Sequence, residues 1–291
     1  MKKRGVTYFI DKLISIIAWV AVIIVFVVVI RVFFFSSFKI PSNSMYPTLI
    51  DGDNVIINKA VVGAKLYNLF AAWRGEEVKI YKLPNMCKIK RNDILVFYFP
   101  YPYKNNIISL DPDNYYIKRC VAISGDTLEI INGYYCVRGT NEKLGNKTMQ
   151  NEFSAVNDSL FNDSTNIYPN NIEVNWSKKN FGPLYIPRKG DTIEMNRQNI
   201  MLYKNLIEWE QDGIIDIINS QMFIDNRLVE TYIFKKNYYF MAGDNVFDSY
   251  DSRNWGLLPE DLVVGKAWFI WKSVNKEDNR IHWGRVFKKV Q

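Results

Sequence analysis

The longest apolar segment of the chain lies close to its beginning. From Ile14 to Ile30 the sequence carries 17 residues without a charge. As an α-helix they span roughly 26 Å at about 1.5 Å per residue, and the aromatic residues that follow extend this toward the ~30 Å of a bilayer core. Arg31 can reach the lipid–water interface from one end. We therefore expect one transmembrane anchor over residues 13–36.

Two other interpretations fit this segment less well. A cleavable secretory signal has a shorter apolar core and a small-x-small cleavage site, whereas this run ends in Arg31-Val-Phe-Phe-Phe. A buried core helix is disfavoured because the run is apolar on all sides and β-branched. The basic residues Lys2, Lys3 and Arg4 place residues 1–12 in the cytoplasm. The chain from about residue 37 onward is then expected outside the cytoplasm.

After the anchor the apolar runs become short, β-branched and aromatic, and Gly, Asn, Asp or Pro bound each of them. Such runs are typical of strands, and they occupy residues 54–58, 94–99, 115–117, 127–130 and 238–241. The sequence therefore predicts a mostly β fold, an extracytoplasmic antiparallel β domain behind a single helix. We expect residues 37–132 and 236–291 to form its core, with residues 133–235 inserted as a smaller lobe.

Three other regions have different patterns. Residues 60–90 are mixed in composition and predict a short helix over about 65–73. Residues 138–180 are rich in Asn, Ser, Asp and Lys, which predicts a loop or a mobile segment. Residues 196–220 allow one or two helices.

Composition and charge exclude several classes of protein. Hydrophobic residues make up 48% of the chain and aromatic residues 15%, so a core can form and disorder is excluded. The net charge is +7, but residues 1–12 contribute +3 of it and no basic tract follows. Nucleic-acid binding therefore has little support.

The cysteines and the single histidine argue against two kinds of stabilising site. Cys87, Cys120 and Cys136 show no CxxC spacing and cannot all pair with one another. His282 is the only histidine and lies in a charged C-terminal tail, which is typical of a surface residue. We expect neither a disulfide framework nor a metal site.

Three polar stretches beside apolar strands carry the candidate chemistry. The first, residues 41–47, holds Ser42 and Ser44 between two prolines directly after the anchor; the second surrounds Lys118, and the third covers residues 243–253. A serine on a rigid turn could act as a nucleophile, although the first stretch alone equally fits a polar linker leaving the membrane. The other two stretches bear on that choice.

A serine needs a base within hydrogen-bond reach to act at neutral pH. Because His282 is a poor candidate, a lysine is the plausible base, and burial would lower its pKa. Lys118 follows two apolar residues on an expected strand, and we expect its amine to be neutral near pH 7. The alternative is a lysine that reaches solvent beside Arg119.

Taken together and in order, these stretches resemble the motifs of bacterial type I signal peptidases, the membrane-bound Ser-Lys proteases that remove signal peptides. The resemblance covers Pro41-Ser42-Asn43-Ser44-Met45-Tyr46-Pro47-Thr48-Leu49, Asn92-Asp93-Ile94-Leu95-Val96-Phe97, Tyr116-Ile117-Lys118-Arg119 with Gly125-Asp126, and Gly243-Asp244-Asn245 with Ser249, Asp251-Ser252-Arg253 and Gly256. It does not reach residues 60–90 or 131–235.

The resemblance implies a role for each matching residue. Ser44 would be the nucleophile and Lys118 the general base and later acid, while the Ser42 hydroxyl and the Ser44 backbone N–H would form the oxyanion hole. Ser249 would hydrogen-bond Lys118 and orient its amine. The residues expected to support the site are Gly243, Asp251 and Arg253. The residues expected to line shallow pockets for small substrate side chains are Ile40, Met45, Leu49, Tyr116 and Ile117.

The resemblance also implies the reaction and its place. The chain would be a serine endopeptidase that cleaves signal peptides with small residues before the cut from secretory preproteins, through an acyl-enzyme and without a cofactor. It would sit in the bacterial cytoplasmic (inner) membrane, with the lipid bilayer as a partner and its oligomeric state left open. Two positions depart from the family pattern: Val246 stands where an Arg is common, and Ser124 stands where a Pro is common.

Three alternatives remain at this stage. One is a catalytically inactive, membrane-anchored β-rich binding or assembly protein of the same fold, and another is a Ser-Lys protease acting on a dedicated target. The third is the Ser-x-x-Lys motif of penicillin-binding proteins, matched by Ser36-Ser37-Phe38-Lys39. That motif belongs at the start of a buried helix, whereas here it borders the bilayer and precedes a proline.

Overall fold

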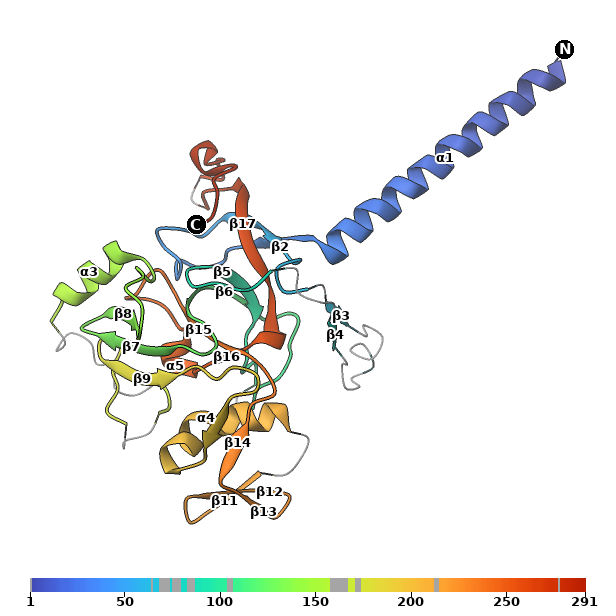
Figure 1. Cartoon of the computed structure of the whole chain (residues 1–291). Helices are drawn as coiled ribbons and strands as arrows, with labels where there is room; N and C mark the ends of the chain where they lie inside the picture. The colour runs from blue at the N-terminus through green and yellow to red at the C-terminus, as the bar shows by residue number, and fades with distance from the viewer. Residues whose placement is uncertain are drawn as a thin grey trace.

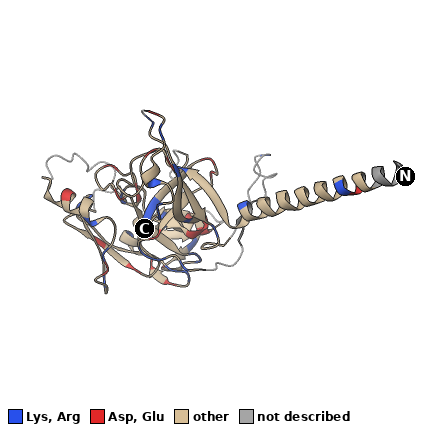
Figure 2. Ribbon diagram, turned by 90° about the horizontal axis from the view of Figure 1, so that it is seen from above, with Lys and Arg blue, Asp and Glu red and all other residues tan. Residues whose placement is uncertain are grey.

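The computed structural model describes residues 2–63, 65–67, 74, 80–82, 87–103, 107–157, 167–170, 174–211, 215–276 and 278–291. The helix α1 (Lys2–Phe33) projects away from a β-rich body (Figure 1). Its part Asp11–Arg31, 21 residues, is long and apolar enough to cross a membrane, and its apolar side chains are exposed. The charged residues of this helix lie near its two ends (Figure 2).

The helix ends before residue 36, the end expected for the anchor. The helix stops at Phe33, and the strand β1 (Phe35–Lys39) follows almost at once and pairs with β2 (Asp53–Asn58). Apolarity alone could not locate this boundary, because Phe34 and Phe35 continue the apolar run while their backbone has already become extended. The Ser36-x-x-Lys39 match therefore lies on a strand and not at the start of a helix.

The main sheet has seven strands, and every pairing in it is antiparallel. Their spatial order is β1, β2, β17 (Val263–Ser273), β5 (Ile94–Tyr98), β6 (Tyr115–Ala122), β15 (Tyr238–Ala242) and β16 (Leu258–Pro259). Four of the strands predicted from the sequence lie in this sheet. The mostly β prediction is confirmed.

The fifth predicted strand, β7 (Thr127–Ile131), belongs to a smaller sheet. It pairs with β8 (Tyr134–Val137) and β9 (Phe181–Tyr185). The remaining sheets join β10 (Thr192–Glu194) to β14 (Thr231–Ile233), β11 (Ile215–Ile218) to β12 (Gln221–Ile224) and β13 (Arg227–Val229), and β3 (Lys65–Tyr67) to β4 (Ile80–Lys82). The helix predicted over 65–73 is wrong at 65–67, where β3 forms, and its remainder lies outside the described residues.

Two α-helices lie between β8 and β11 in the part of this stretch that the structure describes. The prediction of a loop over 138–180 missed α3 (Lys147–Ala155), which Asn146 caps by accepting a hydrogen bond from the Met149 N–H. Residues 158–166 of that predicted loop lie outside the described chain. The helix predicted within 196–220 is confirmed as α4 (Arg197–Glu210), whose buried residues Ile200, Tyr203 and Ile207 form one apolar stripe.

Buried side chains form two main clusters. The larger one includes Phe97 and Phe240 of the main sheet together with Leu184 and Tyr203 of the predicted insertion, residues 133–235. Core and insertion therefore share packing, and the division at residues 133 and 235 stays a prediction. The smaller cluster joins the main sheet to Ile40, Met45 and Leu49, which lie in the loop after β1.

Candidate active site

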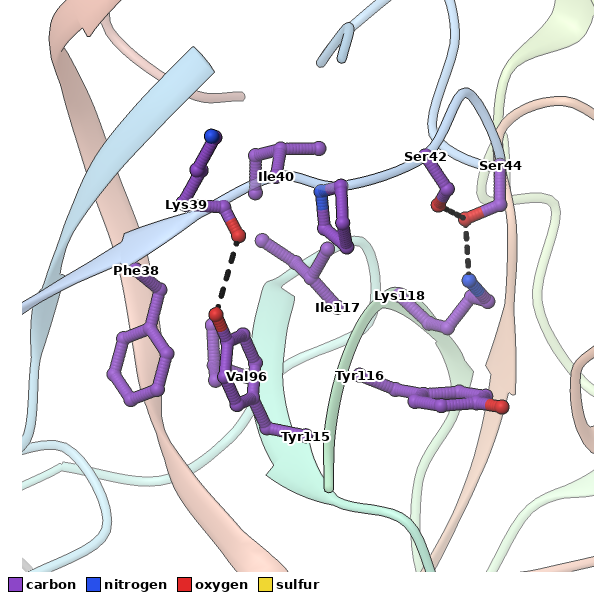
Figure 3. Close-up of a pocket in the computed structure, with 11 residues that line it drawn as sticks. Phe38, Lys39, Ile40, Ser42, Ser44, Val96, Tyr115, Tyr116, Ile117 and Lys118 are labelled. Atoms are coloured by element: carbon purple, nitrogen blue, oxygen red, sulfur yellow. Dashed lines mark hydrogen bonds between the residues drawn. The ribbon is translucent and has the colours of Figure 1, made fainter. Parts of the chain in front are cut away.

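The loop between β1 and β2, residues 40–52, carries the candidate nucleophile. Its two ends are joined, because the Ile40 N–H donates to the Asp53 carbonyl at 2.8 Å and the Gly52 N–H donates to the Ile40 carbonyl at 3.2 Å. Met45 and Leu49 are completely buried and pin the loop to the sheet. These anchors leave Ser42 exposed and Ser44 half-buried, facing β6 (Figure 3).

Strand β6 places a lysine against this serine. Lys118 is only 4% exposed, and its Nζ donates a hydrogen bond to Ser44 Oγ at 2.6 Å. Ser42 Oγ lies 3.3 Å from Ser44 Oγ on the other side (Figure 3). The two serines and Lys118, which is 74 residues from Ser44 in the sequence, are thus brought together with a nucleophile–base contact of the length that proton transfer requires.

The environment of Lys118 favours its uncharged form. The pKa of the Lys118 amine is lowered from its ordinary 10.5 to about 8, chiefly by burial; Asp251 and Asp244 act in the opposite direction, and Arg253 acts with the burial. With a pKa of about 8, roughly one amine in ten is neutral at pH 7. The expectation of a neutral lysine near pH 7 therefore had the right direction and the right cause but overstated the extent.

A buried ion pair holds the chain beside the dyad. Arg253 donates to both carboxylate oxygens of Asp251, through Nε at 2.9 Å and Nη2 at 2.8 Å, and both side chains are 0% exposed. The Gly243 N–H also donates to Asp251, at 2.9 Å. Burial alone would raise the pKa of Asp251, but Arg253 and the Gly243 N–H outweigh it and lower that pKa below its usual value. The predicted contact between Asp251 and Arg253 is present.

The hydrogen bond predicted between Ser249 and Lys118 is absent. Ser249 is buried, and within the described chain its Oγ forms no hydrogen bond with Lys118; it lies beside Asp251 instead and helps to lower the pKa of that carboxyl. The Lys118 amine is instead oriented by Ser44 and lies 5.5 Å from the centre of the Tyr116 ring. The sequence motif indicated that Ser249 would lie near the site, but not which way its hydroxyl would point.

A second buried ion pair was missed in the sequence. Arg119 donates through Nε and Nη2 to the two carboxylate oxygens of Asp244, each at 2.7 Å. The Thr48 hydroxyl donates to the same carboxylate at 2.5 Å, and the Asn245 N–H donates to the Ser44 carbonyl at 3.1 Å. Asp244 therefore ties the nucleophile loop to β6. Its position inside the third polar stretch, beside Gly243, was the signal that could have identified it.

The two departures from the family pattern have structural roles away from the dyad. Val246 is buried against Met149 and Phe153 of α3, and its carbonyl accepts a hydrogen bond from Arg253 Nη1 at 3.2 Å. The Ser124 hydroxyl donates to the Tyr238 carbonyl at 2.8 Å. Val246 thus packs the third polar stretch against α3, and Ser124 links the turn after β6 to β15.

A cleft of about 220 Å³ opens beside the dyad. Of the predicted pocket residues, Ile40, Tyr116 and Ile117 line it together with Ser42, Ser44 and Lys118 (Figure 3). Met45 and Leu49 are not among these lining residues: they are completely buried in the cluster that also holds Ile40 and Ile117, and their part in a substrate pocket stays a prediction. His282 is exposed in the segment after β17 and also lies outside this lining.

Gly243 is expected to tolerate no side chain. A Cβ at this position would lie 2.2 Å from Ser249 Oγ and 2.5 Å from the Ser44 carbonyl oxygen. Because the second contact is with backbone, Gly243→Ala should push the nucleophile loop away from Lys118 and reduce kcat/KM by about 100-fold, as a 1 Å misplacement does. Gly284→Ala is the matched control, since nothing lies within 4 Å of its added Cβ. Steady-state cleavage by a folded Gly243→Ala protein at the wild-type rate would contradict this prediction.

Comparison with known proteins places this fold and site in a family. The family model described as signal peptidase, peptidase S26, matches residues 13–272. Signal peptidase I of Buchnera aphidicola subsp. Schizaphis graminum is 32% identical over 268 residues, which cover 91% of this chain and 76% of that protein. Signal peptidase I of Aquifex aeolicus is 28% identical, covering 86% of this chain and 81% of its own. That of Helicobacter pylori strain J99 is 27% identical, covering 94% and 91%.

The fold and these matches define a class, the membrane-anchored serine endopeptidases. Within that class the chain belongs to the signal peptidases of family S26. It is therefore a hydrolase whose substrates are preproteins that carry signal peptides. No finding favours an inactive binding protein of the same fold.

Proposed function

We propose that this chain cleaves signal peptides by acyl transfer through Ser44, with Lys118 as the general base. The observation that carries the proposal is the 2.6 Å contact between Lys118 Nζ and Ser44 Oγ in a buried environment. A hydroxyl beside a neutral amine can lose its proton as it attacks. The low exposure of Lys118 supports a supply of that neutral amine.

The proposed reaction runs in two balanced halves. Ser44 Oγ attacks the scissile carbonyl carbon while its proton passes to Lys118 Nζ; the resulting ammonium then protonates the departing amine, which is the new N-terminus of the mature protein. An ester to Ser44 remains. Water attacks this ester, Lys118 accepts the water's proton, and that proton is returned to Ser44 as the signal peptide leaves.

Ser42 and the Ser44 backbone N–H are proposed as donors to the oxyanion. The 3.3 Å separation of the two hydroxyl oxygens supports this role, because a carbonyl attacked by Ser44 would develop its negative charge beside Ser42. Asp251, Arg253 and Gly243 are proposed to hold the dyad in place. Ser249 is also proposed to orient the Lys118 amine. Its hydroxyl would have to turn toward Lys118 by a change of the χ1 rotamer.

The cleft supports a preference for small side chains before the cut. Its walls beside the dyad are the apolar side chains of Ile40 and Ile117 and the ring of Tyr116, and its volume is about 220 Å³. That volume is below the usual range for ligand pockets. Bulky residues next to the scissile bond would be excluded, as expected for small-x-small cleavage sites.

We also propose that α1 crosses the cytoplasmic membrane with its N-terminus inside and the β body outside. Lys2, Lys3 and Arg4 support this orientation. Exposed aromatic side chains near the base of α1 support contact of the body with lipid. Phe35 stacks on Trp268 at 5.6 Å and Trp271 donates to Ser37, so β17 carries its aromatic residues beside β1.

The test is cleavage of a signal-peptide-bearing preprotein by the full-length enzyme in detergent. Wild type should release a product whose N-terminal sequence begins after a small-x-small motif, while Ser44→Ala should release none. Ser36→Ala is the matched control, because Ser36 lies on β1 outside the cleft lining. A folded wild-type enzyme that leaves several preproteins intact, or a Ser44→Ala variant that still cuts, would overturn the proposal.

The proposed base predicts a specific pH dependence. The pKa of Lys118 is lowered to about 8, and only the neutral amine can accept the Ser44 proton. kcat/KM should therefore rise with pH to a plateau above about 8 and fall about tenfold per unit below it, since this ratio reports the free enzyme. A profile measured from pH 6 to 10 checks this. A flat profile, or a midpoint near 10.5, would contradict it.

A further inference from the structure

The dyad and a pair of aromatic residues lie at opposite ends of the cleft. Ser42, Ser44 and Lys118 lie at one end, and Phe38 and Tyr115 at the other (Figure 3). One wall comes from β1 and the start of the nucleophile loop, and the other comes from β6. The end with the aromatic residues is the one nearer to α1 along the chain, because β1 follows the anchor directly.

Both walls have a strand edge toward the cleft. β1 pairs with β2 on one side and is the outermost strand of the main sheet. Residues 115–118 of β6 pair with β5, whereas β15 pairs with β6 only from Arg119 onward among the described residues. An extended peptide can add to such edges through main-chain hydrogen bonds.

Tyr115 crosses this space. Its hydroxyl donates to the Lys39 carbonyl oxygen at 3.4 Å, and its ring meets the Phe38 ring edge-on, with centroids 4.6 Å apart and planes at 73°. The bond engages a β1 main-chain acceptor at the cleft edge. An extended peptide that pairs with β1 at this point would need the same acceptor.

The position of Tyr115 can be related to a residue of the bound substrate. Tyr115 precedes Lys118 by three residues on one strand, which corresponds to roughly 10 Å at about 3.3 Å per residue. An extended substrate whose scissile carbonyl lies at Ser44 would thus reach Tyr115 three residues upstream of the residue that carries this carbonyl, which is the fourth residue before the cut.

We propose that Tyr115 is a specificity-determining residue that closes the upstream end of the cleft. It competes with the substrate main chain for the Lys39 carbonyl and, with Phe38, limits the size of the substrate residue four positions before the scissile bond. This inference rests on the proposed function of the dyad and extends it to substrate selection.

Binding is the first test, because it is independent of catalysis. A peptide that spans a cleavage site is titrated onto full-length Ser44→Ala enzyme in detergent, with and without Tyr115→Phe, which keeps the ring and removes the hydroxyl. We expect Tyr115→Phe to bind the peptide about two- to tenfold more tightly, the range of one lost competing hydrogen bond. Tyr134→Phe is the control, because its hydroxyl bonds Asn151 in the insertion. Equal or weaker binding of the peptide by Tyr115→Phe would show that the Tyr115 hydroxyl does not compete with the substrate for the Lys39 carbonyl.

The second test concerns size. Two peptides that differ only by Ala or Trp four residues before the cut are compared on the same Ser44→Ala background. The added substitution Tyr115→Ala removes the ring. The ratio of the affinities for the Ala and Trp peptides should then fall at least fivefold. Unchanged preference would show that Tyr115 sets no size limit. Failure of the proposed function would appear separately, as a wild-type enzyme that binds these peptides and leaves them uncut.

Discussion

Replacing Lys118 with methionine is expected to abolish cleavage and, at the same time, to stabilise the folded protein. Without the amine, the Ser44 hydroxyl has no base within hydrogen-bond reach. The loss should be on the order of 10⁴-fold in kcat, the scale seen when one member of a nucleophile–base unit is removed. Single-turnover cleavage of a preprotein measures it.

The gain in stability follows from the same burial. Lys118 has a folded pKa of about 8 against 10.5 ordinarily, so holding its proton in the folded state costs about 3 kcal/mol. This cost is fully present below pH 8 and disappears as pH rises to 10.5, where the unfolded lysine is also neutral. Lys118→Met removes the charge and keeps an apolar chain of similar length. Its melting temperature should exceed that of wild type by several degrees at pH 7, with a smaller difference at pH 10.

Two variants separate these effects. Lys118→Arg keeps a buried charge that cannot lose its proton, so it should be inert without any gain in stability. Lys204→Met changes an exposed lysine paired with Glu208 and should alter neither activity nor stability. If Lys118→Met still cut within tenfold of wild type, Lys118 would not be the base, and His282 would return as a candidate.

The residues of the dyad could be predicted from the sequence because each lies in a short stretch with its own constraints. Ser44 stands between two prolines after the anchor, and Lys118 follows two apolar residues on a strand. Neither stretch indicates how far apart Ser44 and Lys118 lie in the folded protein. That distance follows from β1, β2 and β6 meeting around one apolar cluster, which is a property of the whole sheet.

The side-chain directions of several residues near the dyad were harder to predict from the sequence. Met45 and Leu49 lie in a turn, where side-chain directions do not alternate as they do along a strand, so adjacency to Ser44 did not indicate which way they point. The Ser249 hydroxyl could not be oriented for the same reason. Asp244 was missed because its partner, Arg119, is 125 residues away, and no local pattern indicates a buried pair of that separation.

Arg253 is the residue whose removal should damage the fold most. It is completely buried, and it neutralises Asp251, which is buried as well. Breaking a buried pair by removing one partner costs about 3–5 kcal/mol, because the remaining charge has lost its compensation. Arg253→Met should therefore lower the melting temperature in detergent by about 10 °C and, by loosening the Gly243 segment beside Ser44, reduce cleavage too.

The pH dependence of this loss identifies its cause. In wild type the pKa of Asp251 is lowered, so its contribution to stability is present above the ordinary carboxyl pKa and is lost as pH falls through the folded value. In Arg253→Met, burial would raise the pKa of Asp251, and the penalty should grow as pH rises through that raised value. The variant should thus be least destabilised at acidic pH.

Two comparisons make this prediction decisive. The double variant Asp251→Leu/Arg253→Met removes both charges and should be more stable than Arg253→Met alone, because no unpaired carboxylate remains. Arg188→Met breaks an exposed pair with Asp191 and should change stability by less than about 1 kcal/mol. If Arg253→Met melted like wild type at pH 8, or lost the same stability at pH 5 as at pH 8, the buried pair would not be what holds this side of the site together.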